Sequence, residues 1–271
     1  MTEPVQIRGT TTVAQIVEIM EQIAPPVLSE AWDNTGLLLG DAASPVDRVM
    51  TCLTLTDVSV QEAVAGGAQM VITHHPLPFK PLTKITTQSA AGRQLWELAR
   101  HAVSIYSPHT SWDSAMDGIN AQLARKLSLI DIESLIPSPH HELGAGRYGD
   151  LAKPLDLNGV AHKLSHGVPH CRLRAVPVAG PITRIGIGCG SGGSFLSAAA
   201  DRGCQLLVTG EATFHACLEA QALGIGMLML GHFASEKFAM DQLASRLASA
   251  LPEVNFWGSR READPVVPLL P

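Results

Sequence analysis

Short apolar runs alternate with amphipathic segments along most of the chain. The runs at 49–55, 68–73 and 102–106 have the length and the β-branched content of buried strands. Between them, segments 58–65 and 90–101 place apolar residues three or four positions apart, which predicts helices. Strands that alternate with helices in this way indicate an α/β fold with mainly parallel sheets.

Two further segments have helical periodicity. The first runs from about Val13 to Ala24, where Thr12 and Gln15 offer a capping box and two prolines follow the last turn. The second is a long amphipathic helix predicted over Ser114–Leu127. The segment 131–181 that comes next is richer in proline, glycine and histidine, which is typical of a boundary between two lobes.

An internal repeat underlies this pattern. The stretch "RVMTCLTLTDVSVQEAVAGGAQMVITHH", from Arg48, aligns without gaps with "RIGIGCGSGGSFLSAAADRGCQLLVTGE", from Arg184, at an offset of 184 − 48 = 136. The next predicted strands also match, since "VSIYSPHTSWD" resembles "GMLMLGHFASE". We therefore expect two pseudo-repeated α/β lobes, residues 1–131 and 132–271, with the C-terminal helix and tail able to pack back on the first lobe.

Polar side chains follow the apolar strands of both repeats. Ligands bind at the carboxyl ends of the strands in open α/β sheets, so these side chains should converge between the lobes. Each of two carboxylates also follows a histidine by four positions, which places both side chains on one face of a helix. The predicted metal ligands are His74, His75, His109, Asp113, His232 and Glu236.

Four imidazoles and two carboxylates are too many ligands for one tetrahedral zinc ion. They suit two divalent ions with bridging or shared carboxylates. Nitrogen and oxygen donors without thiolate fit Zn, Fe, Mn, Co or Ni and do not select among them. Each of these residues could instead have a structural role, as a hydrogen-bonded histidine in the core or as part of a pattern common at helix starts. The repeat favours the metal interpretation.

Other histidines have weaker claims to a site. His215 lies near Glu211 at the same predicted strand end, and either residue could act as a general acid or base or contact a substrate. His162, His166 and His170 are spaced four positions apart, but Gly167 and Pro169 should break any helix that would align them on one face. We therefore predict surface or loop positions for His162, His166 and His170, and no ligand role for His101 or for His140-His141.

A glycine-rich turn offers a rival interpretation. Residues 188–193 match the pattern GxGxxG between a predicted strand and a predicted helix, and Glu211 stands where a ribose-binding acid would be. Against a dinucleotide site, the matching unit at 48–75 has no such glycines, and Glu211 occupies the repeat position of His75. A turn of this kind could equally bind phosphate or sugar through backbone N–H groups.

Composition and charge narrow the class of protein. The net charge is −6 and no basic run occurs, so we expect no direct binding to nucleic acid. No window reaches the 18 apolar residues of a membrane span, and the first residues do not resemble a secretory signal. Five cysteines without a CxxC pair are typical of buried thiols in a reducing cytoplasm.

With these residues in view, the chain resembles the Nif-three-like family, whose members are often called GTP cyclohydrolase I type 2. The resemblance covers nearly the whole chain and includes "EAWDNTGLLLG", "THHP", "HTSWDSAMDGINAQLA", "GAGRYG", "TGEATFH" and "GHFASE". It implies a dinuclear metal site on the six residues given above, and all six positions hold the expected residue types. One departure is Ala216, where many relatives have a second histidine after His215.

The resemblance also implies an assembly and an activity. Family members look like toroidal homohexamers, as trimers of dimers or dimers of trimers, and this chain is similar to the short form without an inserted middle domain. The family's usual name implies hydrolysis of a small-molecule substrate, either opening of a purine ring or attack on a related heterocycle. The alternative, from another class, is a hexamer that binds or delivers metal, or a scaffold, without catalysis.

Overall fold

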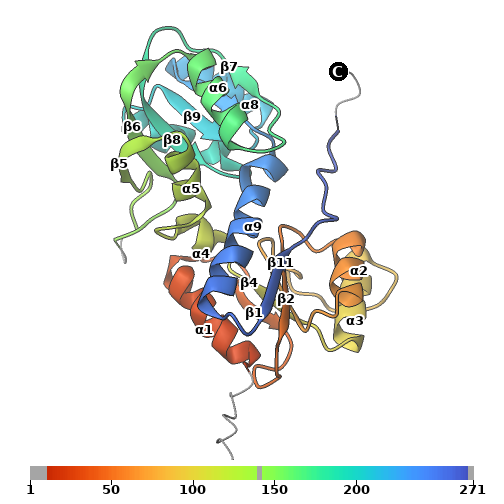
Figure 1. The fold of residues 1–271 in the computed structure, drawn as a ribbon. Coiled ribbons are helices and arrows are strands. Elements are labelled where there is room, and N and C mark those ends of the chain that lie inside the picture. The colour runs from red at the N-terminus through yellow and green to blue at the C-terminus, as the bar shows by residue number, and fades with distance from the viewer. Residues whose placement is uncertain (1–10, 139–141, 268–271) are drawn as a thin grey trace, which may run out of the picture.

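Two β-sheets form the framework of the computed structural model, which describes residues 11–138 and 142–267 (Figure 1). Each sheet has helices packed on it, so the fold is mixed α/β. Within the described residues, no helix is long and apolar enough to cross a membrane.

The first sheet has five strands in the order β1-β4-β3-β2-β11. All neighbours in this sheet are parallel except the edge pair β1 and β4. The bounds of its strands are β1 Gly36–Leu39, β2 Arg48–Cys52, β3 Met70–Thr73, β4 Ser104–Ser107 and β11 Asn255–Gly258. The three central strands coincide with the predicted ones, whereas β1 and β11 have no counterpart in the prediction.

Helices cover both faces of the first sheet. Alternate side chains of β2 enter different cores: Val49 contacts the core that contains α1 (Val13–Ile23), and Met50 contacts the core that contains α2 (Asp57–Ala65) and α3 (Ala90–Arg100). The predicted capping box at the start of α1 is present, with Thr12 and Gln15 bonded reciprocally. A short 3-10 turn, Pro26–Leu28, follows α1.

The second sheet has six strands in the order β5-β6-β8-β9-β10-β7. Only the pairs β8–β9 and β9–β10 are parallel, so the expectation of a mainly parallel sheet is wrong here. The bounds are β5 Leu129–Glu133, β6 Arg147–Leu155, β7 Arg174–Val176, β8 Ile182–Gly188, β9 Leu206–Thr209 and β10 Gly226–Met229. The antiparallel strands β5, β6 and β7 lie in the segment 129–176, where polar residues and Pro154 interrupt the apolar pattern that marks the parallel strands.

Helices of the second sheet, and the helices between the sheets, complete the fold. The sheet carries α6 Leu157–Gly167, the 3-10 turn Gly192–Phe195, α7 Leu196–Asp201 and α8 Phe214–Leu223. The predicted helix over 114–127 is shorter, α5 Ile119–Lys126, and a separate helix, α4 His109–Ser114, precedes it. They separate because the chain turns at Gly118, where a Cβ would lie 1.7 Å from the carbonyl oxygen of Trp112.

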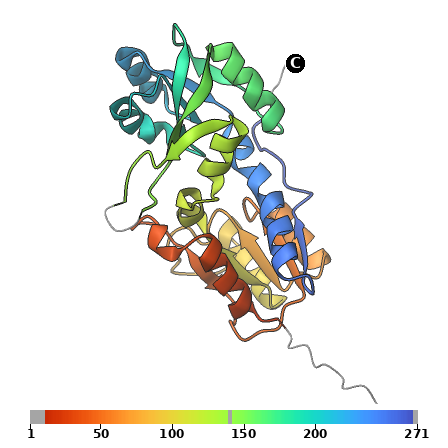
Figure 2. The same ribbon diagram turned by 60° about the vertical axis from the view of Figure 1, so that its left-hand side comes forward.

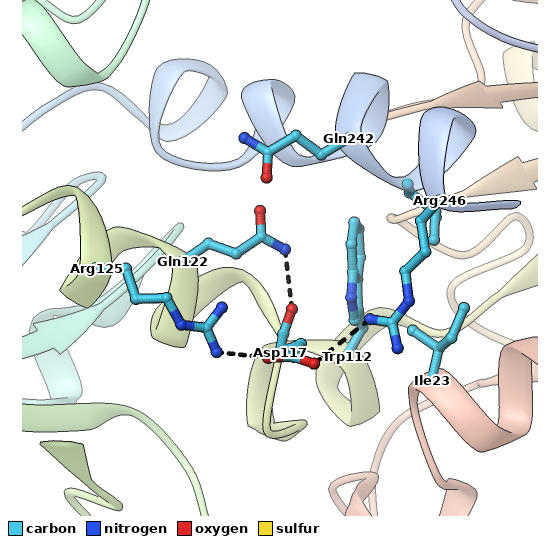
Figure 3. A pocket seen from close by; sticks show the side chains of 8 residues that line it. Ile23, Trp112, Asp117, Gln122, Arg125, Gln242 and Arg246 are labelled. Atoms are coloured by element: carbon cyan, nitrogen blue, oxygen red, sulfur yellow. Dashed lines mark hydrogen bonds and ion pairs between the residues drawn. The ribbon is translucent and has the colours of Figure 1, made fainter. Parts of the chain in front are cut away.

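The long helix α9 (His232–Ala250) connects the two sheets. It begins just after β10 and packs along β2 and β11 of the first sheet, as both Figure 1 and Figure 2 show. Its other face contacts α5, and a small pocket between these helices is lined by Asp117, Arg125 and Arg246 (Figure 3). Because α9 starts at one sheet and ends at the other, it fixes how the two sets of strand ends face each other.

Matching hydrogen bonds occur in the two strand–helix–strand units at the repeat offset. The side-chain oxygen of Gln69 accepts the N–H groups of residues 47 and 48, and that of Gln205 accepts those of residues 183 and 184. Gly67 and Gly203 both have a positive φ, 66° and 71°, in the turn after the helix. The two units therefore share their turn chemistry as well as their sequence pattern.

Candidate metal centre

His74 and His75 continue β3 beyond its last residue and present their rings between the two sheets. Their backbone N–H groups donate to the carbonyl oxygens of Cys52 and Leu53 at 3.0 and 2.9 Å, which extends the pairing with β2. The Thr73 hydroxyl lies within hydrogen-bond distance of the carbonyl oxygen of His75. Thr209 is placed in the same way toward the carbonyl oxygen of Glu211. At both strand ends, a threonine hydroxyl is therefore placed to donate to the carbonyl oxygen two residues later.

The six predicted ligands lie together, although they come from three separate segments: the end of β3, α4 and α9. Donor atoms of His74, His75 and His109 lie within 4.8 Å of one another. Those of His75, His232 and Glu236 form a second such group. His75 belongs to both groups, and its Nε2 lies 3.4 Å from Nε2 of His232.

The carboxylates lie against the histidine rings. Oε2 of Glu236 is 3.2 Å from Nε2 of both His75 and His232. His74 Nε2 is 3.6 Å from Oδ1 of Asp113 and 3.9 Å from Oε1 of Glu236. Asp113 lies outside the two compact groups, at the His74 side of the cluster.

Buried atoms without partners indicate that this cluster fits cations. His74 is fully buried, and neither of its ring nitrogens makes a hydrogen bond; Oε2 of Glu236 likewise has no well-formed hydrogen bond. Unsatisfied buried nitrogen and oxygen atoms are unfavourable unless something else binds them. Neutral imidazole and carboxylate are the donors that divalent transition metals take, so the residues fit the ions expected from the sequence.

Charge in the cluster is unevenly distributed among the side chains. Burial raises the pKa of Glu236, but the surrounding histidines outweigh it and hold that pKa well below its usual range. Burial and the neighbouring charge of Glu236 raise the pKa of Asp113 to about 7. Burial, helped by the neighbouring histidines and only partly opposed by Glu236, lowers the pKa of His74 well below its usual value, which keeps that imidazole neutral. A neutral His74 is the form that can coordinate a cation.

Asp33 holds His109 in position. Its Oδ1 is 2.7 Å from Nδ1 of His109, and its Oδ2 accepts the N–H of Thr110 at 3.1 Å. Burial raises the pKa of Asp33, but these hydrogen bonds prevail and lower it to about 2. His109 itself has a φ of 30°, a strained value for a residue with a side chain. The sequence contained Asp33 within "EAWDNTG", but nothing in that string indicated its partner.

Glu211 holds His232 in a similar way. Its Oε1 is 2.9 Å from Nδ1 of His232 and accepts the Ser191 hydroxyl at 2.7 Å. The adjacent Glu236 carboxylate, 3.2 Å from Nε2, together with Glu211, raises the pKa of His232 to about 9. His215 is exposed and lines an adjoining cavity of about 590 Å³ that also contains Glu211. Of the two predicted acid–base residues, Glu211 thus contacts the cluster directly and His215 faces its neighbourhood.

Cys189 and Asn120 support the Asp113 side of the cluster. The Cys189 thiol lies 3.1 Å from Oδ1 of Asp113 and donates to it, and the Cys189 N–H donates to the side-chain oxygen of Asn120. Asn120 in turn donates to the carbonyl oxygen of Asp113. Cys189 is buried, as expected, but its contact with Asp113 was not predicted.

The glycine-rich turn at 188–193 is filled by protein atoms. A Cβ at Gly190 would lie 2.3 Å from Oε1 of Glu236, and one at Gly188 would lie 2.3 Å from the Phe195 ring. The glycines therefore let the turn approach the cluster and the Phe195 ring closely, which accounts for them without a dinucleotide. The helix after this turn, α7, has only six residues.

The remaining histidines lie away from the cluster. His162 and His166 stack at a ring-centre distance of 4.2 Å on α6 and are exposed, and the helix does not continue far enough to align His170 with them, as predicted. That helix runs to Gly167 before it ends, and His170 lies beyond it with a φ of 61°. His101 is partly exposed and bonds the carbonyl oxygen of Glu97. His140 and His141 lie outside the described residues.

A large cavity opens onto the cluster. It has a volume of about 860 Å³, and His75, His232 and Glu211 form one part of its wall. Arg172 and Arg174 contribute positive charge, and neither forms an ion pair with a carboxylate in the described part of the chain. The rest of the wall is mostly apolar, from Leu53, Leu173, Phe233, Pro265, Val266 and Val267, with Thr54, Gly231 and the acidic Asp264 among them.

Comparison with known proteins shows similarity over most of the chain. The sequence profile of the family described as Duf34/NIF3 (NGG1p interacting factor 3) matches residues 11–265. A Clostridium perfringens protein named GTP cyclohydrolase 1 type 2 homolog is 33% identical over 254 residues, which cover 92% of this chain and 97% of that protein. A Helicobacter pylori protein named GTP cyclohydrolase 1 type 2 is 30% identical, covering 83% of this chain and 87% of the relative.

A solved structure shares the fold. The crystal structure of a Bacillus cereus protein related to NIF3 superposes with a TM-score of 0.87 at 21% identity, covering 95% of this chain and 99% of the other. At this level of identity, the likeness concerns the arrangement of helices and strands.

Proposed function

The chain belongs to the Duf34/NIF3 family, and from this premise we propose that it is a dinuclear metal-dependent hydrolase acting on a nucleotide or a related heterocycle. The observation that carries the proposal is the convergence of buried donor atoms without hydrogen-bond partners, on His74 and Glu236, at the edge of a large cavity. Such a site has the concave form and the few convergent polar groups of an enzyme pocket.

The proposed ligands are divided between two ions by their grouping. His74 and His109, with Asp113 beside them, would hold one ion, and His232 with Glu236 the other. His75 belongs to both groups, and its Nε2 would be a ligand of one of the two ions. Two divalent ions, of Zn, Fe, Mn, Co or Ni, would act as Lewis acids and lower the pKa of water at neutral pH.

The protein's own residues would do the remaining work. Asp33 and Glu211 fix the rings of His109 and His232 through Nδ1, which leaves each Nε2 directed at the cluster. Glu211 also faces the cavity, where it would accept or return a proton, with His215 available in the adjoining cavity. Arg172 and Arg174 would attract an anionic substrate, and the apolar wall would hold its ring system.

We extend the proposal to the origin of the site. The shared hydrogen bonds of Gln69 and Gln205 support an internal repeat that relates the lobes 1–131 and 132–271, with the centre between their strand ends. Exposed apolar side chains, including Trp32 and Phe214, support assembly into the homohexamer that the family resemblance implies. Five free cysteines agree with a cytoplasmic location.

A second candidate function is metal binding or delivery without catalysis. The observation that favours it is the exposed position of His215, in a cavity beside the cluster. Of the two residues predicted to act as general acid or base, only Glu211 then contacts a proposed ligand. The two candidates differ in turnover, not in metal content.

The test combines metal analysis with a substrate panel. Protein purified with added Zn, Mn or Co would be analysed for metal beside His75→Ala and Asp113→Ala variants, and then offered GTP, phosphoesters and cyclic amidines. Turnover by the native protein that is lost in Asp113→Ala supports the hydrolase. Tight metal binding without turnover on any of these compounds supports the delivery role instead.

A further inference from the structure

Glu262 lies in the tail after β11, more than 200 positions from the turn after β2 that it contacts. Its side chain is only 4% exposed. Its Oε2 accepts the N–H of Leu53 at 2.9 Å, and its Oε1 accepts the N–H of Thr54 at 2.7 Å. One carboxylate from the end of the chain thus fixes both peptide groups of the turn that follows β2.

Thr54 carries this contact on to the metal centre. Its hydroxyl oxygen is 2.7 Å from Nδ1 of His75. The opposite nitrogen of that ring, Nε2, is 3.2 Å from Oε2 of Glu236. A continuous set of hydrogen bonds and contacts therefore runs from the tail, through the 53–54 turn, to the one histidine that both donor groups share.

The Glu262 carboxylate occupies an unfavourable place for a charge. Burial raises its pKa above the usual range of a glutamate, although the two backbone N–H groups act in the opposite direction. The nearest cation is Lys237, whose Nζ is 3.9 Å away on α9. An apolar residue could fill this space without the cost of removing a charge from water. The carboxylate is therefore explained by the two N–H groups that it binds, those of Leu53 and Thr54.

A second glutamate holds the same tail on its other side. Glu62, on α2, accepts the Ser259 hydroxyl at 2.6 Å and the N–H groups of Arg260 and Arg261 at 2.8 and 3.1 Å. In the described structure its side chain makes no hydrogen bond to Thr54 or His75. Glu62 and Glu262 therefore anchor one segment with similar bonds, but only Glu262 reaches the metal centre.

We propose that Glu262 is a positioning residue for His75, acting through Thr54. For Nε2 of His75 to bind a cation, Nδ1 must carry the proton and donate it to the Thr54 hydroxyl oxygen. Glu262 holds the turn so that this oxygen stays in line with the ring. This inference depends on the proposed function in one respect, that His75 is a metal ligand.

The test measures metal affinity and the proton position on His75 separately. Affinity for Co²⁺ would be measured by competition with a chromophoric chelator in the full-length protein. The tautomer of His75 would be read from ¹H–¹⁵N long-range correlation spectra of metal-free protein, with His75→Ala used for assignment. The variants are Glu262→Gln, Thr54→Val, Thr54→Ser, Glu62→Gln and the Thr54→Val/Glu262→Gln double variant.

We expect Glu262→Gln and Thr54→Val to weaken Co²⁺ binding by about 10- to 100-fold, the usual effect of removing a partner of a ligand histidine. Thr54→Ser, which keeps the hydroxyl, should bind as the native protein does. Glu62→Gln should lower the melting temperature without changing affinity. The double variant should bind no more weakly than Thr54→Val, because both changes break one set of contacts.

The His75 tautomer distinguishes this inference from the proposed function. Native protein should show the Nδ1–H form, and Glu262→Gln and Thr54→Val should show a mixture with Nε2–H. If these spectra are as expected but native protein binds no metal, the positioning role stands and the proposed function is wrong. If native protein binds Co²⁺ but Glu262→Gln changes neither affinity nor tautomer, or changes them no more than Glu62→Gln, the positioning role is wrong.

Discussion

Oδ1 of Asp33 lies 2.7 Å from Nδ1 of His109, although the two residues are 76 positions apart in the chain. The same relationship joins Glu211 to His232 at 2.9 Å. A carboxylate behind a histidine fixes its tautomer and makes the opposite nitrogen a stronger donor. Asp33 and Glu211 are thus as much a part of the candidate centre as the ligands in front of them.

Asp33→Asn should weaken metal binding by about 10- to 100-fold. The amide that replaces Oδ2 cannot accept the N–H of Thr110, and the lost negative charge no longer supports the ring of His109. Isothermal titration with Zn²⁺ measures the change, with Asp47→Asn, at an exposed position, as the control. An Asp33→Asn affinity equal to that of the control would contradict the role given to Asp33.

Gly190→Ala should disrupt both folding and metal binding. Its φ of 56° disfavours any side chain, and the new Cβ would collide with Oε1 of Glu236. Gly224 has a φ of 68° with nothing within 4 Å of a Cβ, so Gly224→Ala carries the backbone strain alone, about 1–2 kcal/mol. Urea unfolding and metal titration of both variants separate the two effects. Equal losses in both variants would show that the approach to Glu236 is unimportant.

Arg147→Lys should destabilise the protein by about 2–4 kcal/mol, because hydrogen bonds from a charged donor are among the strongest. The buried guanidinium donates to the carbonyl oxygens of Gly144 and Gly146 and to those of Ser114 and Ala115, next to the ligand Asp113. A lysine ammonium cannot span both pairs. Urea unfolding measures the change, and the half-exposed Arg125→Lys serves as the control.

Arg246→Ala should have little effect. Arg246 and Arg125 flank Asp117 in the pocket between α5 and α9 (Figure 3), but all three side chains are about half exposed. Ion pairs in such positions contribute less than about 1 kcal/mol. A loss well above that value in urea unfolding would show that this pocket braces the two helices more strongly than its exposure suggests.

Local sequence signals predicted much of the frame. The Thr12–Gln15 capping box marks the start of α1, the apolar run at 68–73 contains β3, and the run at 102–106 covers all of β4 except its last residue. Each signal is local, so chain neighbours alone decide it. The predicted start of the helix over 114–127 was wrong. The chain turns at Gly118, which lies against the carbonyl oxygen of Trp112, and periodicity does not reveal that contact.

The repeat extended sequence reasoning to the candidate site. It related His109 and Asp113 to His232 and Glu236, and the structure brings these four residues together with His74 and His75. The residues behind the ligands had no such signal. Asp33, Thr54 and Glu262 reach the centre only through long-range pairing, as when β11 joins β2 and carries the tail to the 53–54 turn.

The central claim is that this cluster binds two divalent metal ions. The most direct measurement is the metal content per chain after reconstitution with Zn²⁺ or Co²⁺ and removal of free ions, for native protein and His75→Ala. We predict about two ions per native chain, and a loss of at least one in the variant, since His75 belongs to both donor groups. Native protein that retains no metal, or a variant that retains as much as the native protein, would contradict the account.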